Sequence, residues 1–72
     1  MQTQPFTGMM PSQFAIAQLV FDEIVRAPWF QNTQEAREDC SAMVLRQYRR
    51  GHSGRDALLR ECLAIARQRY AA

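Results

Sequence analysis

Residues 32–70 read NTQEAREDCSAMVLRQYRRGHSGRDALLRECLAIARQRY, and this stretch decides the fold. It holds two runs of helix-forming residues whose apolar side chains recur every three or four positions, which predicts two amphipathic helices. Gly51 lies between the runs, where glycine commonly ends a helix. We therefore expect helices over 32–50 and 53–70, separated by a tight turn.

Both helices have a recognisable start. Asn32, followed three residues later by Glu35, matches a capping box in which Asn replaces Ser or Thr. Ser53, followed three residues later by Asp56, is a similar signal for the last helix. These capping signals predict two separate helices. The stretch shows no strand-like alternation of apolar and polar residues.

The two runs are expected to pack as an antiparallel hairpin. If the chain reverses at the turn, residues that face each other have numbers that sum to about 102. Each such pair matches an apolar residue with an apolar residue: Val44 with Leu58, Met43 with Leu59, Cys40 with Cys62, and Ala36 with Ala66. This agreement supports the hairpin and disfavours a DNA-binding helix-turn-helix, whose helices cross almost at right angles.

A third helix precedes the hairpin. Ser12 is a plausible N-cap, and no Gly or Pro interrupts the helix formers that follow until Pro28, so a helix over 12–27 is expected. Residues 1–11 are predicted to be a flexible N-terminal arm, and 12–72 a single helical domain. The expected fold is all-α, a three-helix bundle.

The first helix has more apolar surface than a small bundle is expected to cover. Its polar strip is narrow, and an aromatic pair follows it in the connection to the next helix. Surplus apolar surface predicts a protein partner, most simply a second copy in a homodimer. The candidate partner-binding residues are Phe14, Leu19, Phe21, Trp29 and Phe30.

The charges are unevenly distributed along the chain. Residues 1–36 have a formal net charge of −2, and residues 37–72 have one of +4. All nine Lys and Arg positions are Arg. The simple explanation is the codon usage of a GC-rich bacterial genome. The alternative is selection for the recognition of phosphate or carboxylate groups. The candidate anion-binding residues gather around the turn: Arg46, Arg49, Arg50, His52 and Arg55.

The sequence shows no pattern typical of an enzyme or of a cofactor-binding or metal-binding protein. Two Cys and one His are too few for a structural zinc site, and Cys40 and Cys62 lack CxxC spacing. Both are expected to be buried, inert thiols, with a disulfide between them left open. A catalytic His52 would need a nucleophile and an orienting carboxylate. Helix capping already explains Ser53 and Asp56, the nearby candidates for these two roles.

The function expected from these features is a small non-enzymatic interaction or regulatory module that self-associates through its first helix. The alternative is a nucleic-acid-binding regulator that uses the arginines around the turn. The start of the chain lacks the pattern of a secretion signal, and Gln18, Asp22 and Glu23 interrupt the longest apolar segment. We therefore expect a cytoplasmic protein with no membrane or small-molecule partner.

Overall fold

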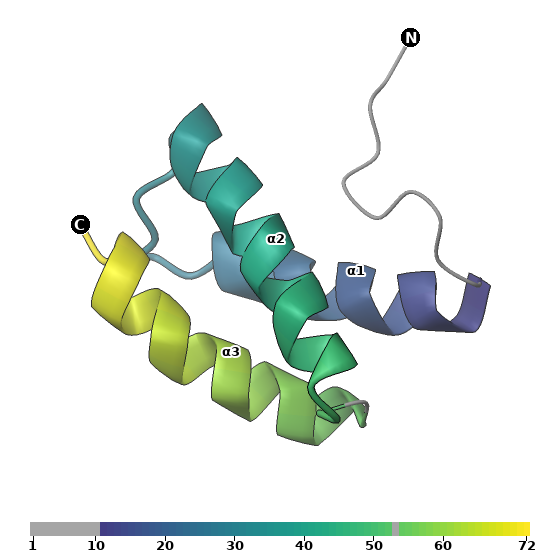
Figure 1. The fold of residues 1–72 in the computed structure, drawn as a ribbon. Coiled ribbons are helices and arrows are strands. Elements are labelled where there is room, and N and C mark those ends of the chain that lie inside the picture. The colour runs from purple at the N-terminus through teal and green to yellow at the C-terminus, as the bar shows by residue number, and fades with distance from the viewer. Residues whose placement is uncertain (1–10, 53) are drawn as a thin grey trace, which may run out of the picture.

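The described part of the chain, residues 11–52 and 54–72, folds in the computed structural model into three α-helices (Figure 1). These are α1 (Pro11–Val25), α2 (Gln34–Arg49) and α3 (Arg55–Tyr70). Each helix contacts both of the others. The predicted all-α three-helix bundle is confirmed.

Helix α1 begins one residue earlier than predicted. Pro11 is its first residue, so Ser12 lies inside the first turn and is not the N-cap. Proline is favoured at the first position of a helix because its fixed φ angle is already helical and its missing N–H has no partner there anyway. The predicted arm, 1–11, lies outside the described residues except for Pro11.

The helix ends at Val25, two residues before the predicted boundary. After Val25 the turn becomes tighter. The Arg26 N–H donates to the Asp22 carbonyl, four residues back, whereas the Ala27 N–H donates to the Ile24 carbonyl, three residues back. Pro28 lies just beyond, so the residue before it is disfavoured in a helical conformation. The connection to α2 therefore starts before the proline.

The predicted capping box at the start of α2 is wrong. The N-cap is Thr33, whose hydroxyl Oγ1 accepts a hydrogen bond of 3.1 Å from the Ala36 N–H. Asn32 lies one residue outside and accepts instead from the Arg37 side chain. Threonine is itself a good N-cap, and Thr33 has the extended backbone that a cap requires.

Gly51 ends α2 as predicted. Its N–H donates to the Tyr48 carbonyl and the His52 N–H donates to the Gln47 carbonyl, which is the hydrogen-bond pattern of a Schellman motif. Gly51 has a φ angle of +113°, a conformation that side chains with a Cβ rarely adopt. Helix α3 starts at Arg55 with Gly54 as its N-cap, later than predicted, and Ser53 lies outside the described residues.

The core draws on all three helices. The largest side chains that are almost completely buried are Val20 and Ile24 from α1, Cys40, Met43 and Val44 from α2, and Leu58 and Cys62 from α3. In the predicted pairs Val44–Leu58 and Cys40–Cys62, both members belong to this set. In the other two predicted pairs, Met43 and Ala66 are buried but Leu59 and Ala36 are only partly buried, and α2 and α3 separate with distance from the turn (Figure 1).

The end of the bundle opposite the turn is closed by a clasp that no sequence pattern predicted. After α3 the chain becomes extended, and Phe30 and Ala71 form an isolated antiparallel β-bridge. The Gln31 N–H donates to the Tyr70 carbonyl at 2.6 Å, and the Ala72 N–H donates to the Trp29 carbonyl at 2.8 Å. We call residues 29–31 and 70–72 the C-terminal clasp.

Candidate functional site

The five residues predicted to bind anions are brought together at one end of the bundle. Arg46 and Arg49 lie in the last turn of α2, Arg50 is its C-cap, and Arg55 begins α3. His52 lies in the turn and is half-buried, whereas the four arginines are exposed. We call Arg46, Arg49, Arg50, His52 and Arg55 the basic tip.

The segment that contains the basic tip has a higher formal net charge than the whole chain. Residues 46–56 hold four Arg and one Asp, a formal net charge of +3, whereas the complete chain has +2. The rest of the protein therefore has −1. None of the four arginines forms a salt bridge with a described residue. Their guanidinium groups are available to an anion from outside.

Helix dipoles account for only part of this cluster. Arg46 and Arg49, near the C-terminus of α2, interact favourably with the partial negative charge there. Arg55 stands in the first turn of α3, where the partial charge is positive, with only Asp56 beside it to compensate. Arg46 and Arg50 are four residues apart, a spacing at which like charges repel. The helix dipoles therefore account for Arg46 and Arg49 but not for Arg55.

The five residues predicted to bind a protein partner do not form one exposed surface. Phe21 and Phe30 are each 6% exposed and belong to the core, which the prediction of a partner surface did not anticipate. The reason is that α1 packs against both other helices, while Phe30 pairs with Ala71 and packs against the Tyr70 ring. Leu19 is 48% exposed, and the side chain of Phe14 lies outside the described residues.

Trp29 and Phe30, offered by the sequence as partner-binding candidates, are part of the clasp and pack beside Tyr70. The Phe30 ring lies 5.6 Å from that of Tyr70 and 6.4 Å from that of Trp29, measured between centroids, in tilted arrangements. Trp29 is half-buried, with the Arg67 guanidinium 5.4 Å from its ring centroid. This corner is a structural cluster, because its rings pack on one another.

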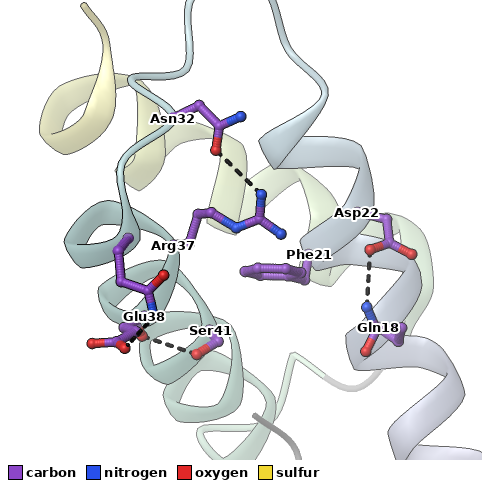
Figure 2. A pocket seen from close by; sticks show the side chains of 8 residues that line it. Gln18, Phe21, Asp22, Asn32, Arg37, Glu38 and Ser41 are labelled. Atoms are coloured by element: carbon purple, nitrogen blue, oxygen red, sulfur yellow. Dashed lines mark hydrogen bonds between the residues drawn. The ribbon is translucent and has the colours of Figure 1, made fainter. Parts of the chain in front are cut away.

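An open cleft of about 860 Å³ lies between α1 and the start of α2 (Figure 2). The residues lining it are Gln18, Phe21, Asp22, Asn32, Gln34, Arg37, Glu38 and Ser41. Sequence reasoning noticed the polar strip that contains Gln18 and Asp22, four residues apart on α1. It missed the α2 side, because no local pattern shows where two helices cross.

The two cysteines are buried and unpaired, as expected for inert thiols. Burial raises the pKa of Cys40 to about 12, with a smaller contribution from Cys62. Burial also raises the pKa of Cys62 to about 12, with a smaller contribution from Glu61. Since the thiolate is the reactive form, both are poor nucleophiles near neutral pH.

In residues 11–52 and 54–72, no group of three or more His, Cys, Asp or Glu side chains is arranged to hold a metal ion. The described helices include none with the length and apolar character needed to cross a membrane. No protein-family model, curated protein or solved structure matches the chain.

Proposed function

We propose that this protein is a small non-enzymatic regulatory module that binds the phosphate backbone of nucleic acid through its basic tip. The observation that supports this most directly is the gathering of four exposed arginines, without salt bridges to described residues, at one end of a chain that is otherwise slightly acidic. Guanidinium groups are planar, and they donate paired hydrogen bonds that fit phosphate oxygens.

The burial of α1 makes the basic tip a better candidate for a binding surface than the first helix. Before the fold is considered, the apolar surface of α1 is the stronger candidate for an interface. In the structure Val20, Phe21 and Ile24 are buried by neighbouring helices, so most of that surface is already used. The arginines of the tip have no comparable internal role.

The proposed contact is to the backbone and does not read the base sequence. Tyr48, the aromatic residue nearest to the tip in sequence, is half-buried and offers little surface for stacking on an unpaired base. At the start of α3, the polar side chains next to the turn are those of Arg55 and Asp56. Two side chains are a small set for contacts to base edges. Phosphate recognition needs only the positive charges and their N–H donors.

The test is fluorescence anisotropy with labelled duplex DNA and duplex RNA over a range of salt concentrations. If four arginines each neutralise one phosphate, the logarithm of the DNA affinity falls with the logarithm of salt concentration with a slope of about −3.6. Arg49→Gln and Arg55→Gln should each reduce the steepness of that slope by about 0.9. Binding of neither duplex at low salt would refute the proposal.

Arg26→Gln is the matched control. It removes the same charge from an exposed residue just beyond α1, at the other end of the bundle from the tip. This variant should bind with nearly the wild-type slope. A loss equal to that of Arg49→Gln would mean that net charge, and not the basic tip, drives the binding.

Self-association through α1 is the second candidate, and one observation favours it. Leu19, at 48% exposed, is the one large hydrophobic side chain among the described residues that lies open to solvent. If it lies in a homodimer interface, light scattering after size exclusion should show a dimer that Leu19→Gln converts to a monomer. A wild-type monomer at high concentration would remove this candidate.

A further inference from the structure

The cleft between α1 and α2 contains three charged side chains that come from both of its walls. Asp22 belongs to α1, whereas Arg37 and Glu38 belong to α2. Figure 2 shows Arg37 extending from α2 across the cleft toward α1. Phe21, almost completely buried, also lines the cleft. The cleft is thus lined by charged side chains from both helices and by an apolar side chain of the core.

Each of these charged groups is held by a neutral amide. The Gln18 amide Nε2 donates to Asp22 Oδ1 at 2.9 Å, and the Gln34 Nε2 donates to Glu38 Oε2 at 2.9 Å. Arg37 Nη1 donates to Asn32 Oδ1 at 3.3 Å.

The amides orient the three groups without neutralising them. None of the three forms a salt bridge with a described residue. Each keeps hydrogen-bonding capacity for a ligand: Asp22 has its second oxygen, Glu38 has its second oxygen, and Arg37 has its other N–H donors. The cleft therefore presents one positive and two negative groups in prearranged positions.

A ligand that complements this set has one carboxylate and two cationic groups. We propose that the cleft binds a free basic α-amino acid, such as arginine. Its carboxylate would pair with Arg37, and its ammonium and side-chain cation would pair with Asp22 and Glu38. This site is separate from the basic tip, which lies at the other end of α2. The cleft is open, so each pair is partly screened by water and the affinity is expected to be millimolar.

The test is an amide NMR titration with two probes, L-arginine and agmatine, which is arginine without its carboxylate. L-Arginine should shift the resonances of Gln18, Asp22 and residues 32–41 in a saturable manner. It should bind at least about threefold more tightly than agmatine, because agmatine cannot pair with Arg37. Equal affinities for the two probes, or shifts located elsewhere in the protein, would overturn the proposal.

Arg37→Gln separates the role of the carboxylate from the rest of the binding. This variant should lose the preference for L-arginine while binding agmatine at least as well as the wild type does. Arg60→Gln, which removes an exposed arginine from α3 outside the cleft, is the matched control and should keep the preference. Far-UV circular dichroism and the amide spectrum check that both variants are folded.

The basic tip of another copy offers the same guanidinium chemistry as free arginine. Cleft resonances that shift with protein concentration in the absence of a probe would show that a second copy occupies the cleft. That outcome would refute the amino-acid proposal and leave the nucleic-acid experiment unaffected, since the latter is scored by the salt dependence of the tip variants. Resonances that stay constant on dilution are the expected result.

Discussion

Replacing Gly51 and Gly54 separately by alanine isolates the effect of one backbone angle on the turn between α2 and α3. A Cβ atom added at either glycine meets no other atom within 4 Å, so neither substitution creates a clash. The two sites differ in backbone conformation. Gly51 has a φ angle of +113°, whereas Gly54 has a φ of −77° and a ψ of 142°, which any residue adopts easily.

The size of the difference follows from these angles. Alanine at Gly51 must be held in a conformation that costs about 1–3 kcal/mol, partly offset by about 0.4–1 kcal/mol because alanine reduces the entropy of the unfolded chain. A net loss of about 1–2 kcal/mol is expected. At Gly54 the same entropic gain opposes the loss of a residue favoured at the N-cap, and the result should lie within about 0.5 kcal/mol of the wild type.

Thermal and urea denaturation, followed by far-UV circular dichroism, measure both variants against the wild type. In a domain of this size, Gly51→Ala should lower the Tm by roughly 5–15 °C, while Gly54→Ala should leave it nearly unchanged. If Gly51→Ala is as stable as Gly54→Ala, the positive φ at Gly51 does not strain alanine, and the Schellman ending of α2 is not what holds the turn.

Three further predictions concern the core, the clasp and the thiols. Ile24→Ala should cost about 2–5 kcal/mol in urea denaturation, because Ile24 is completely buried; a cost below about 1 kcal/mol would contradict its central position. Tyr70→Phe removes the hydrogen bond from the Tyr70 hydroxyl to Asp39 but keeps the ring against Phe30, so it should cost about 1 kcal/mol, and the loss should vanish in an Asp39→Ala background. Burial raises the pKa of both thiols from 9.0 to about 12, so the unfolded state releases these protons first and the free energy of unfolding should fall as pH rises above 9. Replacing both cysteines by alanine should reduce that pH dependence, and burial of Tyr70, which also raises the pKa of its hydroxyl, accounts for the part that remains.

Local sequence patterns determined the helices and the turn of this protein. The three-to-four-residue spacing of apolar side chains predicted α2 and α3, and Gly51 marked the end of α2, because both signals depend on neighbouring residues along one helix. The caps were less accurate. Asn32 and Thr33 are both good N-caps one position apart, and only the path of the connection into α2 selects Thr33.

The gathering of the basic tip was also predictable from the sequence. Arg49, Arg50 and Arg55 flank a turn of a few residues, so any hairpin brings them to the same end of the molecule. Their exposure follows as well, because charged side chains without partners are rarely buried. What this surface binds is a property of its chemistry, which the salt-dependence experiment addresses.

The tertiary structure alone decided which parts of α1 and its connection remain exposed. Phe21 and Phe30 are buried and Leu19 is not, although all three are large and apolar. Two features join residues that are far apart in the sequence. One is the clasp between Phe30 and Ala71, and the other is the cleft in which Arg37 extends toward α1. Periodicity shows which face of a helix is apolar, but the angle and depth at which helices cross depend on the packing of side chains from different elements. The sequence therefore predicted the helices and the charged tip, and only the packing of α1 against both other helices decided that most of its apolar face is core.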